Sequence, residues 1–552
     1  MSIASPPPPT PQRIAIIGGG LAGLVAAHRL SELARERGVN IAVTLFESGP
    51  RLGGVIGTER VGGYLIDTGA DSFLTSKPAA VNLCRRLGIE NQLTSTSEQH
   101  RGALVLFDGR PQPVPEGFQL MSPTAIWPML VSPILSPWGK LRMAMEYFVP
   151  PRPVSSVACS FPQPSNLNPQ PLPDESLASF VRRRFGREAL ERLVQPLVGG
   201  IYTSDPEKLS LAATMPRFLE MERDRGSLLA ATLFSKETTV SQQPTADSRS
   251  SGSLPYQDGS ATDTKSSGAR YGLFAGLAGG MEDLLSALRS RVDAACEVRL
   301  NAPVTRIVRE SAVSGTPCVF DGRGQGTQQP TPFAKPQGVP PDDPLHRNSY
   351  RVELADGASC SFDAVLMTAP AHRAASLLGE LDPELAVALD EIEYASSAIV
   401  VTGHRLEEIA HPLNAFGLVV PQRERRKVLA VSFSSRKFPD RAPSGSVLLR
   451  TFVGGALQPE LLSLSDDELV SLVRSELAEM FGVRGQPDFV RVFRYPRAMP
   501  QYHVGHLDRV ARIEALTARH SGFALAGNAY RGVGIPDVIA SGETAAESVL
   551  GG

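Results

Sequence analysis

Apolar residues near the beginning of the chain follow two different periods in quick succession. Residues 13–17 form a short continuous apolar run, and residues 21–35 carry apolar positions three and four apart. Residues 41–46 form a second short run that is rich in β-branched side chains. A helical period between two short apolar runs is typical of a β-α-β unit, so we expect a strand, a helix and a second strand here.

Strand and helix patterns continue along most of the remaining chain. Residues 174–235 have helical spacing, with Asp174 as the expected N-cap of the first helix. Residues 271–310 return to a β-α pattern, and residues 350–370 predict a hairpin that turns at Asp356-Gly357. The last 30 residues predict a strand, a glycine turn and a helix. Alternation of this kind indicates an α/β protein.

Three segments lack such a pattern. The leader, residues 1–11, contains four consecutive prolines, and residues 236–270 and 311–349 are rich in small, polar and proline residues. Their apolar side chains are too few to offset the entropy lost on ordering. We therefore expect a disordered leader and two disordered surface insertions.

Composition narrows the class of protein. The chain has 552 residues, and its net charge of −2 offers no basic field that would attract nucleic acid. At roughly 150 residues per domain, this length suggests two to four domains. Five cysteines without a CxxC pair predict neither a disulfide framework nor a zinc site, and the histidines lack metal-ligand spacing. We expect a cytoplasmic protein without a metal site.

Residues 117–139 contain no charged side chain, which raises the question of a membrane span. The segment is interrupted by Pro123, Pro128, Pro133 and Pro137, each of which removes a backbone donor. Because backbone groups in lipid must find partners within the protein, a chain broken this often is a poor span. We expect broken apolar helices that either line a pocket or touch a membrane surface.

The strongest local motif is a glycine turn between the first strand and the first helix. Gly18, Gly20 and Gly23 have the GxGxxG spacing, with Leu21 and Ala22 between them. Gly18 permits a tight turn, Gly20 lets the backbone approach a pyrophosphate, and Gly23 lets the helix pack on the strand. The N–H groups at the start of the helix would then face the phosphates.

An acidic residue follows at the expected place. Glu47 ends the second strand 24 residues after Gly23, and Ser48 is next in the chain. A carboxylate at this position accepts hydrogen bonds from ribose hydroxyls. The order of strand, turn, helix, strand and acid predicts a dinucleotide site.

Further motifs carry a resemblance to a known family. ESGPRLGG (47–54) is similar to the RxGG extension of the FAD-dependent amine-oxidase superfamily, and DTGA (67–70) to its segment near the isoalloxazine. FAGLAGGM (274–281) resembles its GGM helix start. LAGN (525–528) and RGVGIP (531–536) resemble the segment that closes over the flavin pyrimidine.

The resemblance implies an FAD site formed by both ends of the chain. Beyond the residues named above, it assigns cofactor contacts to Arg51, Gly53, Gly54, Gly69, Ala70, Val304, Gly527, Asn528, Val533, Gly534 and Ile535. No cysteine follows Cys360, so the C-terminal cysteine that tethers flavin in some amine oxidases is missing. We expect one non-covalent FAD per chain.

Within that superfamily, the chain resembles the protoporphyrinogen and coproporphyrinogen III oxidases. The similarity is carried by residues 69–73, 106–115, 179–211, 416–417, 436–443, 495–506 and 532–547. The implied reaction is a six-electron oxidation of protoporphyrinogen IX to protoporphyrin IX, or of coproporphyrinogen III to coproporphyrin III. It implies hydride transfer to FAD, dioxygen as acceptor and release of H2O2 in haem biosynthesis. The two substrates differ in vinyl and propionate side chains, and the sequence does not distinguish them.

Four residues are predicted to contact the substrate. Phe416 is expected to pack against a pyrrole ring, and Gly199 and Gly200 to let the backbone come close. Plant and animal relatives carry an arginine for a substrate propionate where this chain has Ala103. Arg101 lies two residues earlier and is therefore the candidate for a substrate carboxylate here. Because the flavin carries the chemistry, we predict no catalytic side chain.

One departure from the family concerns charge. Asp71 stands where relatives have asparagine. A carboxylate there would repel a propionate, so we expect Asp71 to face elsewhere.

The expected fold class is α/β plus α+β, with three domains. The Rossmann-like FAD-binding domain is expected in residues 12–100, 271–310, 350–375 and 490–552. The mixed-sheet substrate domain is expected in residues 101–116 and 376–489, and an inserted helical domain in residues 117–235.

Other classes stay open at this point. An amine oxidase or carotenoid desaturase is one alternative, and Tyr530 lies where an amine oxidase would place part of an aromatic cage. A non-catalytic FAD-binding escort protein is another. The implied partners are a porphyrinogen, dioxygen and a ferrochelatase that receives the product. A monomer and a homodimer are both open, as is peripheral contact with the inner membrane.

Overall fold

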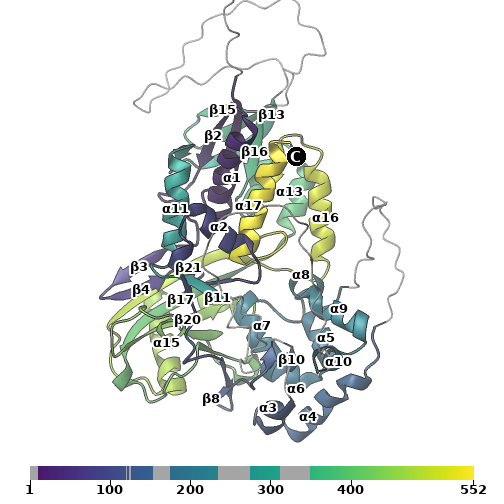
Figure 1. Ribbon diagram of the computed structural model, residues 1–552, viewed down its shortest axis with the longest axis vertical. Helices are drawn as coiled ribbons and strands as arrows, with labels where there is room; N and C mark the ends of the chain where they lie inside the picture. Colours follow the sequence, from purple (N-terminus) through teal and green to yellow (C-terminus); the bar gives the residue numbers. More distant parts are fainter. Residues whose placement is uncertain are drawn as a thin grey trace, which may run out of the picture.

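The computed structural model describes residues 10–119, 121–123, 126–152, 174–233, 274–310 and 349–551. The leader and both insertions expected from the sequence lie almost entirely outside these residues. Figure 1 shows three regions: a parallel sheet with its helices at the top, a second sheet at the lower left, and a group of helices at the lower right.

The parallel sheet has five strands in the order β12-β2-β1-β16-β22. Its strands are β1 (Gln12–Ile17), β2 (Ile41–Phe46), β12 (Glu297–Arg299), β16 (Ala364–Met367) and β22 (Phe523–Leu525). Helix α1 (Leu21–Arg37) joins β1 to β2, so the predicted β-α-β unit is confirmed. The chain leaves β1 toward β2 on one side, while β16 lies on the other. Such a reversal opens a crevice at the carboxyl ends of the strands.

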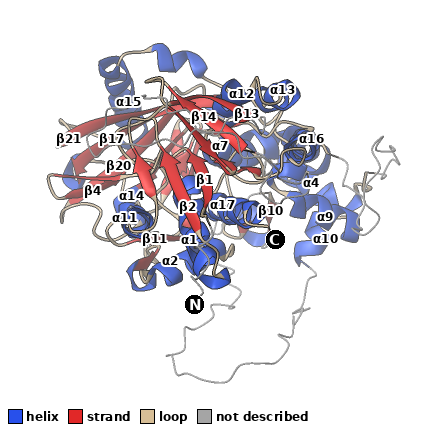
Figure 2. Cartoon of the chain, turned by 90° about the horizontal axis from the view of Figure 1, so that it is seen from above, coloured by secondary structure: helices blue, strands red, loops and turns tan. Residues whose placement is uncertain are grey.

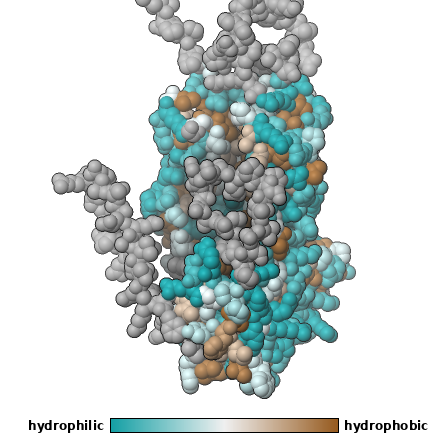
Figure 3. All heavy atoms as spheres, turned by 90° about the vertical axis from the view of Figure 1, so that its right-hand side faces the viewer, coloured by the Kyte–Doolittle hydropathy of each residue, from teal (hydrophilic) through white to brown (hydrophobic). Residues whose placement is uncertain are grey.

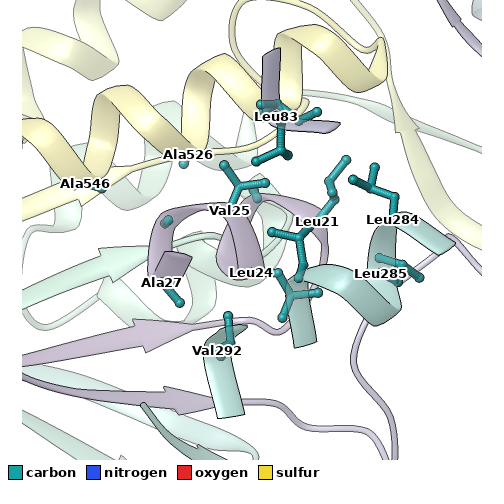
Figure 4. Close-up of a cluster of buried hydrophobic side chains, with 14 of the residues drawn as sticks. Leu21, Leu24, Val25, Ala27, Leu83, Leu284, Leu285, Val292, Ala526 and Ala546 are labelled. Carbon is teal, nitrogen blue, oxygen red and sulfur yellow. The ribbon is translucent and has the colours of Figure 1, made fainter. Parts of the chain in front are cut away.

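Three helices pack on one face of this sheet (Figure 4). They are α1, α11 (Glu282–Asp293) and α17 (Ile535–Val549), with α2 (Ala79–Leu87) beside them. Leu21, Leu24 and Val25 of α1 meet Leu284 and Leu285 of α11 in one apolar cluster. A Cβ added to Gly542 of α17 would lie 2.7 Å from the Ala22 carbonyl oxygen, so α17 and α1 approach closely because the residue is glycine.

A small antiparallel sheet and three helices cover the other face. The sheet contains β13 (Val304–Glu310), β14 (Ser349–Leu354) and β15 (Ser359–Phe362). The helices are α12 (Ala371–Leu378), α13 (Pro383–Asp390) and α16 (His506–Thr517). The predicted hairpin turn is confirmed, with Gly357 at φ +86°.

The second sheet has seven strands in the order β21-β17-β20-β19-β18-β7-β8. They are β7 (Leu104–Phe107), β8 (Arg110–Pro113), β17 (Tyr394–Arg405), β18 (Gly417–Val419), β19 (Ala430–Phe433), β20 (Ser446–Gly454) and β21 (Phe489–Pro500). Helices α14 (Ser434–Lys437) and α15 (Asp466–Phe481) belong to this region, with α15 on one face of the sheet.

Two expected domain boundaries do not follow the packing. β21 pairs with β17 along its length, so residues 490–500 lie in the second sheet and not with the parallel sheet. Conversely, α13 packs with α16 in the cluster on the parallel sheet, although residues 376–390 were expected in the substrate domain. Strand and helix patterns in sequence do not reveal which sheet an element joins.

The lower right region is mainly helical, as expected for residues 117–235 (Figures 1 and 2). Its helices are α3 (Ile126–Val131), α4 (Pro137–Ala144), α5 (Leu177–Arg184), α6 (Arg187–Ala189), α7 (Gln195–Tyr202), α8 (Leu211–Thr214), α9 (Pro216–Arg225) and α10 (Leu228–Leu233). The expected N-cap of α5 was wrong, because Ser176 caps that helix. Asp174 instead accepts from the Ser210 hydroxyl at 2.8 Å and the Gly505 N–H at 3.0 Å.

Short strands connect the regions. They are β3 (Thr58–Val61), β4 (Tyr64–Asp67), β5 (Phe73–Leu74), β6 (Leu93–Ser95), β9 (Phe118–Gln119), β10 (Ser122–Pro123) and β11 (Phe274–Leu277). Among the described helices, none has the length and apolar character that crossing a membrane requires.

Candidate dinucleotide and substrate site

The first glycine turn is formed where β1 ends and α1 begins. Gly18 has φ +113°, and its N–H donates to the Phe46 carbonyl at 2.8 Å. A Cβ on Gly23 would lie 1.9 Å from the Gly18 carbonyl oxygen. Thr368, just after β16, donates its hydroxyl to that same carbonyl at 2.8 Å. Gly18 and Gly23 are therefore required by the turn itself.

Gly20, by contrast, is not required by the turn itself. Its φ of −72° and ψ of −175° are open to any residue, and no described heavy atom lies within 4 Å of an added Cβ. Helix α1 begins beside it without a capping side chain and without an acidic residue in its first turn. The first N–H groups of a helix lack partners within the helix, and the helix dipole favours an anion there. The open space at Gly20 thus fits a pyrophosphate.

Leu21 and Ala22 follow with side chains that are 6% and 5% exposed. Because these side chains point into the core, only the backbone of the two residues is available to a ligand.

Glu47 holds the first turn to the loop after β2. Its Oε2 accepts from the Gly19 N–H at 2.8 Å, and its Oε1 accepts from the Gly49 N–H at 2.7 Å. The Ser48 hydroxyl donates to Oε1 at 3.2 Å. Oε1 thus accepts two hydrogen bonds, whereas Oε2 accepts one and keeps a lone pair for a ribose hydroxyl.

The predicted adenine contact lies next to this loop. The Ala302 N–H donates to the Glu47 carbonyl at 2.9 Å, and the Asn301 N–H to the Gly49 carbonyl at 3.0 Å. These bonds bring Val304, the first residue of β13, toward the end of β2. Val304 is half-buried, and the strand register shifts just after it.

A second glycine pair meets the first turn. The Gly53 N–H donates to the Gly19 carbonyl at 2.8 Å, and a Cβ on Gly54 would lie 3.3 Å from the Gly20 Cα. Arg51 donates to the carbonyls of Gly54 at 2.7 Å and Ile56 at 2.9 Å. The guanidinium therefore shapes this loop, and its contact with a diphosphate stays a prediction.

The C-terminal turn lies at the same edge of the sheet. Gly527 follows β22 with φ +133°, and its N–H donates to the Ser541 hydroxyl at 3.0 Å. The Tyr502 hydroxyl donates to the Asn528 carbonyl at 2.6 Å and accepts from the Gly532 N–H at 2.8 Å. Since β16 separates β1 from β22, the first and last turns flank a single strand.

The residues that lead into α17 join two regions. Gly534 precedes α17 without a side-chain cap. Ile535 packs in the same cluster as Leu21, and Val533 packs against the helical region. The tail of the chain thus touches both the parallel sheet and the helices that were expected near the substrate.

Tyr530 is buried beneath this turn. It is 7% exposed and packs with Ala371 and Ile513 in the cluster behind the sheet. Burial raises the pKa of its phenol. An aromatic cage needs rings that face a ligand, so this position gives the amine-oxidase alternative no support.

Segment 67–70, predicted to lie near the isoalloxazine, is held by the second sheet. Gly69 approaches the backbone of residue 55 so closely that an added Cβ would lie 2.2 Å from the Val55 oxygen. Arg450 of β20 donates to the Gly69 carbonyl, and Ala70 beside it is exposed. Asp67 pairs with Arg441 at 3.2 Å and accepts from the Met281 N–H at 2.8 Å.

Asp71 lies between two cations. Its carboxylate is 2.8 Å from Lys437 Nζ and 3.0 Å from Arg450 Nη1. Burial alone would raise the pKa of this carboxyl, but Lys437 and Arg450 outweigh it and hold the pKa well below its usual range. Asp71 therefore stays ionised, and two cations around one carboxylate leave a net positive charge.

Sequence reasoning missed Lys437, Arg441 and Arg450 as residues that position the segment at 67–71. The stretch RKFPDRAP (436–443) carried the only signal, as part of the family resemblance. Its partners lie more than 350 residues away in the chain, so no local pattern could have assigned these roles.

The predicted substrate residues lie where the helical region meets the second sheet. Gly199 and Gly200 are in the last turn of α7, and Thr203, the C-cap of this helix, has φ +50°. A Cβ on Gly200 would lie 3.4 Å from Val419 Cγ1 of β18. Both glycines line a small pocket with Gln195, Pro196, Thr203, Ser204, Val420, Leu429 and Leu457.

The other two predicted substrate residues are less open. Phe416 is 3% exposed, and its N–H donates to the Gly102 carbonyl at 3.0 Å at the beginning of β18. Arg101 lies 3.6 Å from Glu98. Their contact with substrate stays a prediction.

The parallel sheet carries the glycine turns from both ends of the chain at one edge. This arrangement is typical of the dinucleotide-binding class of α/β proteins. The family model described as "Flavin containing amine oxidoreductase" matches residues 21–325 and 343–550. The chain belongs to the flavin-containing amine oxidoreductase family, and the expected superfamily and fold class are confirmed.

Individual relatives are similar over nearly the full length. A coproporphyrinogen III oxidase of Bacillus subtilis is 29% identical over 541 residues, which cover 98% of each chain. Protoporphyrinogen oxidase 2 of Arabidopsis thaliana is 28% identical, covering 98% of this chain and 94% of that protein. A solved structure named "Putative protoporphyrinogen oxidase" from Exiguobacterium has a TM-score of 0.73 at 26% identity, covering 98% of this chain and 99% of that one.

Cyclohexylamine oxidase from Brevibacterium oxydans is a more distant structural neighbour. It has a TM-score of 0.59 at 15% identity and covers 98% of this chain and 99% of that one. At this identity the similarity shows the shared fold alone.

Proposed function

We propose that this chain is an oxygen-dependent porphyrinogen oxidase of haem biosynthesis that binds one FAD non-covalently. The observation that carries the proposal is the full-length similarity to enzymes named for two porphyrinogens, at 29% and 28% identity. The open pyrophosphate position at Gly20 supports the cofactor. We keep the cofactor and substrate residues predicted above as the proposed contacts.

The proposed reaction depends on how the substrate is positioned against the flavin more than on acid–base catalysis. The bound flavin supplies hydride acceptance, with dioxygen as the final acceptor and hydrogen peroxide as the product. The chain's charged side chains around the C-terminal turn are already paired. Asp537 is 2.6 Å from Lys77, and Arg531 is 2.6 Å from Glu514. These residues hold the turn, and Gly200 of α7 keeps the space beside Val419 free of a Cβ.

Coproporphyrinogen III and protoporphyrinogen IX are the two candidate substrates. Reconstituted holoprotein should convert at least one to a fluorescent porphyrin, and peroxide should appear in the ratio that six electrons require. Anaerobic addition of the same porphyrinogen should bleach the flavin absorbance. A protein that binds FAD and leaves both porphyrinogens unchanged would refute the substrate class and leave the cofactor intact. An aromatic porphyrin is the metal-accepting form, so we retain a ferrochelatase as its proposed recipient.

We also propose that the lower end of the helical region contacts a lipid surface. Apolar side chains gather there in Figure 3, over the part of the molecule that contains α3 and α4. Both tryptophans of the chain belong to this patch, Trp127 at 73% and Trp138 at 79% exposed. The other members are Leu130, Val131, Leu141, Met145, Tyr147 and Phe148. Tryptophan is favoured at membrane interfaces, and a patch of this kind seldom stays in water.

The two tryptophans provide the assay, because all indole fluorescence reports from the patch. Phosphatidylethanolamine–phosphatidylglycerol vesicles should shift the emission to the blue and cosediment with the protein. Trp127→Ser with Trp138→Ser should abolish cosedimentation. Val387→Ser, which removes an apolar side chain that is 57% exposed on α13, should leave it unchanged. Self-association without lipid that the double variant removes would instead assign the patch to a homodimer.

A further inference from the structure

A pocket of about 350 Å³ lies on the face of the second sheet that α15 covers. One buried side chain of β17, His404, forms its floor, and α15 supplies most of the rest. The polar residues from α15 are Asp467, Ser471, Arg474 and Ser475. Val470, Leu477 and Val483 add an apolar wall.

This pocket is separated from the dinucleotide site by the sheet. Side chains along a strand point alternately to its two faces. Ile399 and Val401 of β17 pack with Tyr64 on the side of segment 64–72, whereas Val400 packs in the α15 cluster. His404 has the parity of Val400 and therefore lies on the α15 side.

His404 lacks a hydrogen-bond partner within the described part of the chain. It is 1% exposed, and both ring nitrogens are buried and unsatisfied. Burial lowers the pKa of the ring to about 4, while Asp488 acts in the opposite direction and Arg474 in the same one. At neutral pH the ring is uncharged, with one N–H donor and one acceptor. A buried polar group without a partner is costly and rare, so a partner that enters the pocket would explain it.

Arg474 supplies a charge to the same pocket. It is half-buried, and it has no ion pair with any residue that the structure describes. Ser471 and Ser475 lie three residues before and one after it, on the surface of α15 that borders the pocket. Asp467 is exposed in the first turn of α15 and is the one carboxylate among the pocket's lining residues. The half-buried Arg474 guanidinium and a ring N–H of the buried His404 therefore favour an oxyanion, and the Asp467 carboxylate limits that anion to the inner part of the pocket.

We propose that this pocket binds a small organic carboxylate. The carboxylate accepts hydrogen bonds from the Arg474 guanidinium and from a ring N–H of His404, and the hydrocarbon part lies against Val470 and Leu477. A planar guanidinium is well matched to a carboxylate, and the pocket volume is in the range of small-ligand sites. The site is independent of the flavin reaction, because it lies across the sheet from the cofactor residues.

The test is calorimetric titration of the full-length holoprotein with butyrate, and separately with inorganic phosphate and butylammonium. We expect butyrate to bind and the other two to bind at least tenfold more weakly. Arg474→Gln should weaken butyrate at least tenfold. Arg405→Gln is the matched control, since Arg405 is next to His404 in β17 but points to the opposite face and is 65% exposed. It should bind butyrate as the original protein does.

The role of His404 is first tested in the unaltered protein. Ring-¹⁵N-labelled histidine in the holoprotein should show one buried, neutral imidazole whose nitrogen shifts move on addition of butyrate. His404→Phe should lose that signal and the tight binding, with flavin absorbance unchanged. Absence of butyrate binding, equal binding by Arg474→Gln, or phosphate binding as tight as butyrate would each overturn the proposal.

Discussion

Replacing Gly20 by alanine separates cofactor binding from folding. The backbone of Gly20 is extended, and an added Cβ meets no described atom within 4 Å. That Cβ would stand in the space that we assign to a pyrophosphate. Gly20→Ala should therefore leave the apoprotein folded and weaken FAD.

The magnitudes follow from the same geometry. Alanine at a permitted glycine position stabilises a protein by about 0.4–1 kcal/mol, and loss of glycine at an N-cap offsets part of this. The melting temperature of the apoprotein should thus change by about 1 °C or less. Displacing one phosphate from a backbone N–H costs about 1.5–3 kcal/mol, which is roughly a 10- to 150-fold increase in the Kd for FAD.

Gly23→Ala is the matched comparison. Its Cβ would lie 1.9 Å from the Gly18 oxygen, so the turn itself must move. Overpacking of this kind costs about 1–3 kcal/mol or more, and it should lower the melting temperature of the apoprotein as well as weaken FAD.

Circular dichroism of the apoproteins and quenching of FAD fluorescence during reconstitution measure the two effects separately. A Gly20→Ala protein that binds FAD with unchanged affinity would show that the phosphates do not pass Gly20. A Gly20→Ala apoprotein as unstable as Gly23→Ala would show that the space at Gly20 is not open.

Three further predictions concern charge and the C-terminal turn. Lys437 and Arg450 hold the pKa of Asp71 below the value of an unfolded aspartate, which is about 3.9. The ionised Asp71 therefore stabilises the fold at every pH above about 3.9. The contribution is lost as the pH falls toward the folded pKa, so Asp71→Asn should flatten the acid side of the unfolding free energy against pH; an unchanged slope would contradict this. Arg184 is fully buried against Glu146, so Arg184→Met should lower the free energy of unfolding by about 3–5 kcal/mol, because it leaves a buried carboxylate without its cation. Urea unfolding should show that the double variant Arg184→Met with Glu146→Gln recovers part of this loss. Tyr502→Phe removes the hydroxyl between the Asn528 carbonyl and the Gly532 N–H, so FAD should dissociate about 5- to 10-fold faster in stopped-flow release, whereas an unchanged rate would place FAD away from this turn.

Much of the dinucleotide site could be predicted from the sequence because it depends on local chemistry. The turn at Gly18 needs a positive φ, and Gly23 needs the absence of a Cβ. Both requirements select glycine at fixed spacing, whatever the rest of the chain does. The order of strand, turn, helix and acid was therefore readable without the structure.

The contacts that fix segment 67–71 could not be predicted in this way. Lys437, Arg441 and Arg450 reach it from α14, the following loop and β20, and nothing in their own neighbourhoods marks them. The same applies to β21, whose apolar pattern indicates a strand but not which sheet it joins. Long-range packing determines which strands pair, and a local sequence pattern carries no information about it.

The sequence by itself determined the β-α-β unit, the glycine turns and the family, because each depends on backbone geometry within a few residues. Only the tertiary structure decided that Asp71 keeps its charge between two cations and that His404 is buried without a partner beside Arg474. The physical reason is that ionisation and hydrogen bonding depend on the distance and burial of groups from remote elements. Those quantities exist only once the sheets and helices have packed.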